Sequence, residues 1–411
     1  MIALLLALAT GSLDSPQTWT QFRLASSNNA VVRGSLQTMW TLKTAGPFSS
    51  SPAIAGGVLY VGNNAGRMYA IDPATGTVKW TARVHNPLMA VPIVYGRLVI
   101  VGEGNEKSPN GSTPSDPIHV GSPPNALVAF DRLTGAIVWE RALQGSGMPM
   151  PAIVDGMLVQ HNGAGYVLGV NPADGAVAYA RNVTAIASMT AALPLGGGRF
   201  ATAGVDPNEV LMLRASDGGV IWRSVFSASA SGIGDCPAVS DRVRIYCDYD
   251  TPPASGVPMQ TERSSIFRAY ALDAATGKKL WDAPLERGIV PKRNEAAIPL
   301  LVHGTLYLGC SLAPYVHALD PATGSVRWRF RAHGPVKGGI VEAGGVLYFG
   351  DFGGYLWAVN AKNGSVIGAR KMHVPFNVGS PVVAGQTLVI GAANGTLFAM
   401  PLAHVRSGKD R

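Results

Sequence analysis

Short apolar stretches, separated by turns rich in Gly, Asp and Asn, follow one another along almost the whole chain. The first complete set has apolar stretches at 52–54, 58–61, 67–71 and 77–80, separated by turns at 56–57, 63–66 and 72–76. Stretches of three to five such residues bounded by turn residues are typical of β-strands. The pattern therefore predicts a unit of four antiparallel strands.

The turn before the fourth strand carries a motif, Ala-x-Asp-x-x-Thr-Gly-x-x-x-Trp, that recurs along the chain. Clear copies lie at 70–80, 129–139, 271–281 and 318–328, and worn copies lie at 169–179, 212–222 and 358–368. In this turn the Asp side chain can bond its own backbone, and the Gly supplies a positive φ. Regular recurrence of one four-stranded unit is typical of the blades of a β-propeller.

An eighth unit is split between the two ends of the chain. Residues 380–384, 388–391 and 396–400 supply three strands but no Thr-Gly turn and no Trp, whereas residues 36–42 form an isolated fourth strand with Trp40. Joining these two parts closes the ring and removes its open edges. The sequence thus predicts an all-β fold: an eight-bladed β-propeller of four-stranded antiparallel blades spanning 19–402, closed by its N-terminal strand, with residues 403–411 as a tail.

The repeat resembles that of the PQQ-type (quinoprotein-like) β-propellers, and the opening Trp-Thr-Gln-Phe-Arg at 19–23 resembles the lead-in common in that family. The resemblance covers residues 19–402. It implies the propeller fold directly but leaves the activity open, because the family includes both PQQ-dependent dehydrogenases and non-catalytic BamB-like scaffolds.

The N-terminus and the charge balance bear on location and partners. Residues 1–12 have an apolar core at 2–9 and a small-residue cleavage pattern ending at Ala9, which is typical of a signal peptide although no basic residue precedes the apolar core. We therefore expect a periplasmic or extracellular protein without a transmembrane segment. The net charge of +8 is spread thinly, which favours a generally basic exported protein over one that binds nucleic acid; a basic face for an acidic partner remains an alternative.

The strand order places two kinds of connection on opposite faces of the disc. The Asp-x-x-Thr-Gly turns lie on one face, here named the turn face; the loops between blades and between second and third strands lie on the other, the loop face. Two long insertions, 103–125 and 249–265, both fall on the loop face. Long loops without structure of their own are often functional. We therefore expect a monomeric ring that acts as a binding or scaffold module for a protein partner or envelope complex, contacting it through these insertions.

The entries to the innermost strands should line the mouth of the central channel on the loop face. Three methionines, Met89, Met148 and Met189, occupy one aligned position in consecutive blades and either fill the channel or form an apolar platform. A polar arc faces them and consists of Asp235, Lys292, Arg293, Asn294, Glu295, Lys337 and Asn377.

The family resemblance implies an alternative function for this mouth, a periplasmic PQQ-dependent dehydrogenase oxidising an alcohol or sugar. Ca²⁺ would then bind Asp235, Asn294 and Glu295, of which Asp235 and Glu295 would be the catalytic pair. The quinone would contact the following residues: Arg293, Asn294, Lys337, Asn377, Met89, Met148 and Met189. The absence of a vicinal Cys-Cys pair and of a Cys-x-x-Cys-His haem motif argues against this alternative, so the primary expectation is a non-enzymatic protein without a cofactor.

Histidine and cysteine offer two further hypotheses. His85, His333 and His373 each follow the Trp position by five residues, which reflects either inheritance of the repeat or a metal-binding rim. Cys236 and Cys247 flank a turn near Asp241, so the strand register sets them opposite each other at disulfide distance, and Cys310 remains as a buried thiol. A disulfide at Cys236–Cys247 is expected only in an oxidising compartment.

Overall fold

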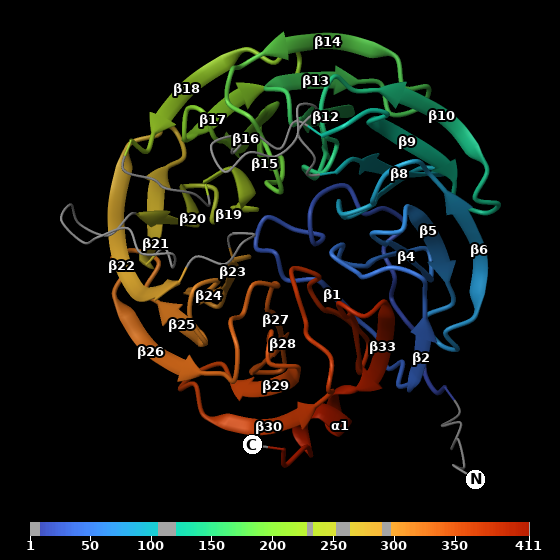
Figure 1. Ribbon diagram of the computed structural model, residues 1–411, viewed down its shortest axis with the longest axis vertical. Helices are drawn as coiled ribbons and strands as arrows, with labels where there is room; N and C mark the ends of the chain where they lie inside the picture. Colours follow the sequence, from blue (N-terminus) through green and yellow to red (C-terminus); the bar gives the residue numbers. More distant parts are fainter. Residues whose placement is uncertain (1–8, 106–120, 228–232, 252–263, 290–296, 411) are drawn as a thin grey trace.

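Eight β-sheets are arranged like the blades of a fan around a central axis (Figure 1). The computed structural model describes residues 9–105, 121–227, 233–251, 264–289 and 297–410. Each sheet is one blade, and we number the blades from the one that contains β3. The predicted all-β, eight-bladed fold is confirmed. None of the helices in the described ranges is long and apolar enough to cross a membrane.

Each blade contains four antiparallel strands, numbered outward from the axis. The innermost strands are β3 (Ala53–Ala55), β7 (Ile93–Tyr95), β11 (Ala152–Val154), β15 (Leu193–Gly196), β19 (Val239–Ser240), β23 (Leu300–Val302), β27 (Val341–Ala343) and β31 (Val382–Ala384). The second strands are β4 (Val58–Gly62), β8 (Leu98–Glu103), β12 (Met157–His161), β16 (Arg199–Gly204), β20 (Arg244–Thr251), β24 (Thr305–Gly309), β28 (Val346–Gly350) and β32 (Thr387–Gly391).

The third strands are β5 (Arg67–Ile71), β9 (Ala126–Asp131), β13 (Tyr166–Val170), β17 (Glu209–Arg214), β21 (Ser264–Asp273), β25 (Tyr315–Leu319), β29 (Tyr355–Asn360) and β33 (Thr396–Pro401). The outermost strands are β6 (Val78–Arg83), β10 (Ile137–Ala142), β14 (Val177–Asn182), β18 (Val220–Val225), β22 (Lys279–Ile289), β26 (Val326–Arg331), β30 (Val366–Lys371) and, for blade 8, β2 (Trp40–Lys43). Three short elements complete the fold: β1 (Val31–Val32), the 3₁₀ turn η1 (Ile233–Asp235) and α1 (Leu402–Arg406).

The repeated Trp and turn Gly form the seams between neighbouring blades. The indole of Trp40 covers Gly76 of the next blade so closely that a Cβ at Gly76 would lie 2.7 Å from the ring, and Gly76 also has φ +75°. The indole Nε1 of Trp40 donates a hydrogen bond to the carbonyl of Pro73 at 3.0 Å. The same arrangement recurs at Trp80, Trp139, Trp222, Trp281 and Trp328. The motif therefore encodes the contact between blades as well as the turn itself.

The ring is closed between the two ends of the chain, as predicted. Strand β2 pairs antiparallel with β33, in a register that sets Trp40 opposite Ala399 and Lys43 opposite Thr396. The closing strand begins at Trp40 rather than at residue 36, because residues 34–37 bond instead with residues 10–13 and with β31–β32. Strand β1 also joins blade 8 as a fifth, parallel strand beside β31.

The seam between blades 7 and 8 has a different composition. The Trp position of blade 7 is Gly368, and a Cβ there would lie 2.4 Å from the carbonyl oxygen of Arg406. Helix α1 thus occupies the space that an indole fills at six other seams and Tyr179 fills at the seam between blades 3 and 4. Residues 408–410 then run beside the outer edge of β30, with the Ala369 amide bonded to the Gly408 carbonyl at 3.1 Å. The predicted C-terminal tail is therefore part of the packed structure.

Residues 16–32, here named the N-terminal plug, cross the end of the channel on the turn face. Their backbone bonds the inner strands one after another: Trp19 pairs with Val94, the Ile153 amide donates to Thr20, and the Ser240 amide donates to Ser26. The Leu301 and Val383 amides donate to Ser27 and Ala30. The plug therefore ties chain-distant blades together at the axis. Residues 1–8 of the predicted signal peptide lie outside the described ranges.

Candidate functional site

The mouth of the channel on the loop face is narrowed by methionines. Met89, Met148 and Met189 precede the inner strands of blades 2, 3 and 4 and form one buried cluster with Val378 of blade 8. The predicted alignment of the three side chains is thus a contact in space. Because the cluster is buried, its thioethers fill the described part of the channel rather than lining an open platform.

The other end of the channel is filled from the plug. Trp19 and Phe22 are buried at the axis. Between Phe22, Met189 and Val378 only a cavity of about 10 Å³ remains, which Asp235 also lines. That volume is no more than a single water molecule needs. The described part of the channel is therefore closed at the turn face and packed up to its methionine cluster.

A buried cation lies in the plug near the axis. The guanidinium of Arg23 is 1% exposed and donates three hydrogen bonds, to the carbonyls of Asn28 (2.8 Å), Pro381 (3.0 Å) and Ile340 (2.8 Å). Burial lowers the pKa of Arg23 to about 9, so the side chain is still cationic at neutral pH. Its bonds join the plug to blades 7 and 8. The sequence placed Arg23 in a family motif but gave no sign of this role.

The predicted polar arc is only partly within the described ranges. Asp235, Lys337 and Asn377 are described, whereas Lys292, Arg293, Asn294 and Glu295 lie outside them. Lys337 is 7% exposed, and the Oδ1 atom of Asn377 is buried without a hydrogen-bond partner among the described residues. Asp235 lines the cavity next to Met189.

The inside of the channel has no room for the quinone that the family resemblance suggests. A tricyclic cofactor needs a flat space, and the cavity between the methionine cluster and the plug is only about 10 Å³. Of the proposed ligands of Ca²⁺, only Asp235 is described. We therefore derive no reaction step that passes through PQQ.

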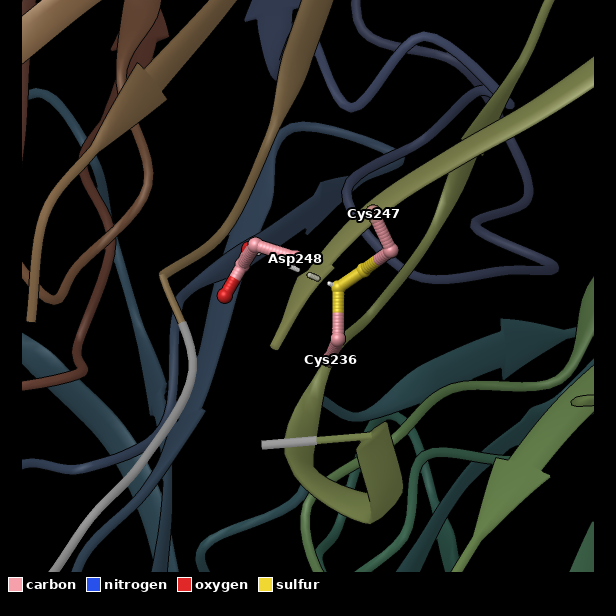
Figure 2. A group of neighbouring side chains, drawn as sticks. All are labelled: Cys236, Cys247 and Asp248. Carbon is pink, nitrogen blue, oxygen red and sulfur yellow. Dashed lines mark hydrogen bonds between the residues drawn. A yellow bond between two sulfur atoms is a disulfide. The ribbon is translucent and has the colours of Figure 1, made fainter. Parts of the chain in front are cut away.

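A group of buried carboxyls lies beside the predicted cysteine pair in blade 5. Cys236, just after η1, and Cys247 of β20 are joined by a disulfide with Cα atoms 6.2 Å apart, and Figure 2 shows Asp248 next to them. Five other blades have glycine at the position of Asp248: Gly62, Gly102, Gly309, Gly350 and Gly391. The second insertion is also shorter than predicted, because residues 249–251 and 264–265 continue strands β20 and β21.

Burial and neighbouring charge change the acidity of Asp248. The side chain is fully buried, and its pKa is raised well above the usual value by desolvation and then by the nearby charge of Asp250. Its Oδ1 accepts a hydrogen bond from the Ala297 amide at 3.2 Å, and its Oδ2 lies 3.7 Å from Cys236 Sγ. A disulfide sulfur has no proton to donate, so this contact fits a protonated Asp248 that donates to sulfur.

The cysteine pair leads to a direct prediction. In protein taken from an oxidising compartment, mass spectrometry without reduction should show Cys236 linked to Cys247, with Cys310 alkylated only after unfolding, because Cys310 is buried. The two cysteines are 11 residues apart, so loss of the bond in a double Ser variant should lower the free energy of unfolding by about 2–3 kcal/mol. A Cys310→Ala variant is the control, and three free thiols in the native protein would refute the pairing.

The three predicted rim histidines occupy different environments. The ring of His333 packs at a tilt against Tyr355 with ring centroids 4.1 Å apart, and its backbone amide donates to Asp351. His373 has a positive φ of 58°. His85 is exposed, and its amide donates to the buried Glu103. The shared position thus reflects a backbone contact with the carboxylate in blades 2 and 7.

Comparison with known proteins agrees with this architecture. The family model described as outer membrane protein assembly factor BamB matches residues 28–112, 102–244 and 267–408. A tetrathionate hydrolase of Acidithiobacillus ferrooxidans is 26% identical over 373 residues, covering 87% of this chain and 73% of its own.

Two solved structures share the fold. BamB from Moraxella catarrhalis aligns with a TM-score of 0.63 at 14% identity, over 88% of this chain and 98% of its own. A europium-containing methanol dehydrogenase aligns with a TM-score of 0.65 at 12% identity, over 92% of this chain and 91% of its own. The repeat, the ring and the family match together show that this chain belongs to the PQQ-like β-propeller family typified by the outer membrane protein assembly factor BamB.

Proposed function

We propose that this chain is an exported scaffold that binds a protein of the cell envelope through the loop face. The observation that carries this proposal is the extension of blade 5. Its outermost strand β22 has 11 residues and β21 has 10, whereas the outermost strands of the other blades have six or, in blade 8, four. The added length continues toward the loop face, where the second insertion begins and ends.

The extension presents groups that an extended protein segment can bind. Strand β22 is the edge of its sheet. Pro284 interrupts the amide row, but residues 285–289 follow it. Ile289 is 52% exposed, and Val225, at the corresponding end of β18 in blade 4, is 62% exposed. An unpaired strand edge beside apolar side chains favours the addition of a partner strand. In blade 7 the chain's own residues 408–410 occupy this kind of edge.

Exposed apolar residues near the turn face are not gathered on one blade edge as Val225 and Ile289 are on neighbouring blades at the loop face. Ile137, Val177 and Val326 follow the repeated turn in separate blades. They are therefore spread around the ring, and isolated apolar residues of this kind are normal on a protein surface. The matching family model and several relatives are named outer membrane protein assembly factor, which supports a scaffold role for this chain.

The proposal is tested by moving charge onto one face at a time. The full chain is immobilised and used to capture proteins from an extract of its native envelope. A Val225→Lys/Ile289→Lys variant should lose its specific partner by at least about tenfold, since each lysine would have to be desolvated in the contact. The matched Ile137→Lys/Val177→Lys variant should capture it like the wild type. If Ile137→Lys/Val177→Lys loses the partner and Val225→Lys/Ile289→Lys keeps it, the contact lies on the turn face and the proposal is wrong.

A second candidate is hydrolysis of a sulfur compound such as tetrathionate, and the buried carboxyl of Asp248 favours it. A carboxyl kept protonated by its surroundings can act as a general acid, and relatives with tetrathionate hydrolase activity in their names match most of the chain. In this case the same preparation should release thiosulfate from tetrathionate. The isosteric Asp248→Asn variant, which keeps a hydrogen-bond donor but no acidic proton, should lose this activity without losing the fold.

A further inference from the structure

One buried carboxylate oxygen in blade 2 has no hydrogen-bond donor among the described residues. Glu103, the last residue of β8, has no exposed surface. Its Oε2 accepts hydrogen bonds from the amides of His85 and Asn86, both at 2.8 Å. Its Oε1 is buried and has no hydrogen-bond partner among the described residues. A buried carboxylate oxygen without a partner carries a desolvation penalty that a bound cation would offset.

Two further ligand groups lie near this carboxylate and come from different elements. His85 Nδ1, in the loop that leaves blade 1, lies 3.6 Å from Glu103 Oε1. Glu140 of β10 joins them because Glu140 pairs with Val128 and Val128 pairs with Val101, which sets its side chain on the same side of blade 2 as Glu103. Ligand atoms of the three residues all lie within 4.8 Å of one another.

Blade 7 offers an internal comparison. Asp351 occupies the position of Glu103 and likewise accepts from a histidine amide, that of His333, at 3.0 Å. Its oxygens also accept from the Tyr355 amide at 2.9 Å and from Trp357 Nε1 at 2.8 Å, so both are satisfied. The position of Glu140 in that blade is Ala369. Blade 7 therefore has a histidine and a carboxylate in the same positions, but neither a carboxylate oxygen without a hydrogen-bond partner nor an equivalent of Glu140.

We propose that His85, Glu103 and Glu140 form a binding site for a divalent transition-metal ion of the Zn²⁺ class. One imidazole nitrogen and two carboxylates are ligands that such ions accept, with bonds of about 2.0–2.2 Å. Ligand atoms on one ion are therefore at most about 4.4 Å apart. The His85–Glu103 separation already meets this limit. Glu140 and His85 are exposed at the surface, so small rotamer changes can bring the remaining atoms into range.

The site would link three elements at the base of the first insertion. The ion would supply the missing partner of Glu103 Oε1 and would neutralise the repulsion between two carboxylates. Burial raises the pKa of Glu103, and the charge of Glu140 adds to this rise, so a cation here would favour the ionised form. The insertion begins directly beside it, where Asn105 Nδ2 bonds Asn86 Oδ1 at 2.7 Å.

The test uses the full chain after treatment with a chelator and dialysis. Co²⁺ is titrated while visible d–d absorption is recorded, and Zn²⁺ uptake is measured by elemental analysis. We expect one ion per chain. Glu140→Gln and His85→Asn should each weaken binding by at least about tenfold. His333→Asn, the matched change in blade 7, should leave both the affinity and the spectrum unchanged.

Melting temperature provides an independent readout, because an ion that binds only the folded chain raises its stability. Zn²⁺ should raise the melting temperature of the wild type and of His333→Asn, but not that of Glu140→Gln. Glu140 is exposed, so its replacement by the isosteric Gln leaves the fold intact. The proposal is overturned if the wild type takes up no ion, or if Glu140→Gln binds Co²⁺ with the affinity and spectrum of the wild type.

Discussion

Deletion of residues 36–43 is expected to open the ring and to turn a stable protein into one that self-associates. The deletion removes β2, which supplies the four outermost residues of blade 8. It also removes Trp40, which covers Gly76 and donates to the Pro73 carbonyl across the seam with blade 1. Strand β33 would then become an open edge, and such edges pair with other chains. Size-exclusion chromatography and thermal unfolding report both effects.

A milder variant separates closure from the loss of one large side chain. Trp40→Ala should lower the free energy of unfolding by about 2–4 kcal/mol, since Trp40 is only partly buried. Trp328→Ala is the matched control, because Trp328 makes the same contacts with Gly364 and Ala361 inside a continuous stretch of chain. Amide exchange in β33 should rise in Trp40→Ala alone, because only the closing strand can detach by fraying. Equal protection of β33 in both variants would contradict this closure scheme.

The repeat made the architecture predictable from sequence because one motif serves two purposes. The Asp and Gly shape the turn, and the same Gly lets the preceding blade's Trp lie flat against it, as at Gly76 and Trp40. Wherever the motif is intact, as at 129–139, it therefore fixes both the strands and the neighbouring blade. At Gly368, which has no side chain to pack into the seam, the sequence indicated only a worn repeat. That α1 fills this seam depends on a segment with no repeat of its own.

The plug and the candidate metal site escaped prediction for different reasons. Most of the plug meets the inner strands through isolated backbone contacts rather than as a long paired strand, so it does not repeat the strand-and-turn pattern of the blades. The metal site did leave a signal, since Glu103 stands where Asn63, Asn162 and Asp351 stand in other blades. However, its meeting with Glu140 depends on the cross-strand register through Val128. Only the alignment of strands, not spacing along the chain, brings the two carboxylates together.

Replacement of Arg23 by Met is expected to destabilise the propeller from its axis. Met matches the length of the apolar stem but leaves three buried carbonyls, those of Asn28, Pro381 and Ile340, without their donor. Hydrogen bonds to a charged group contribute about 1.5–3 kcal/mol each. The variant no longer has to bury a charged guanidinium, and the desolvation free energy saved in this way offsets part of this loss. A net decrease of about 3 kcal/mol in the free energy of unfolding is therefore expected.

Two control variants distinguish the loss of the hydrogen bonds made by Arg23 from a general effect of removing a positive charge. Arg33→Met removes an exposed arginine from the segment that follows the plug, and it should leave stability unchanged to within about 0.5 kcal/mol. Arg23→Lys keeps the cation but cannot reach three carbonyls with the same geometry, so it should fall between the wild type and Arg23→Met. Limited proteolysis should then cut within residues 16–32 first in Arg23→Met, because the plug loses its bonds to blades 7 and 8. If Arg23→Met matches Arg33→Met in stability and in resistance to cleavage, the guanidinium does not hold the plug, and the backbone bonds to the inner strands are sufficient.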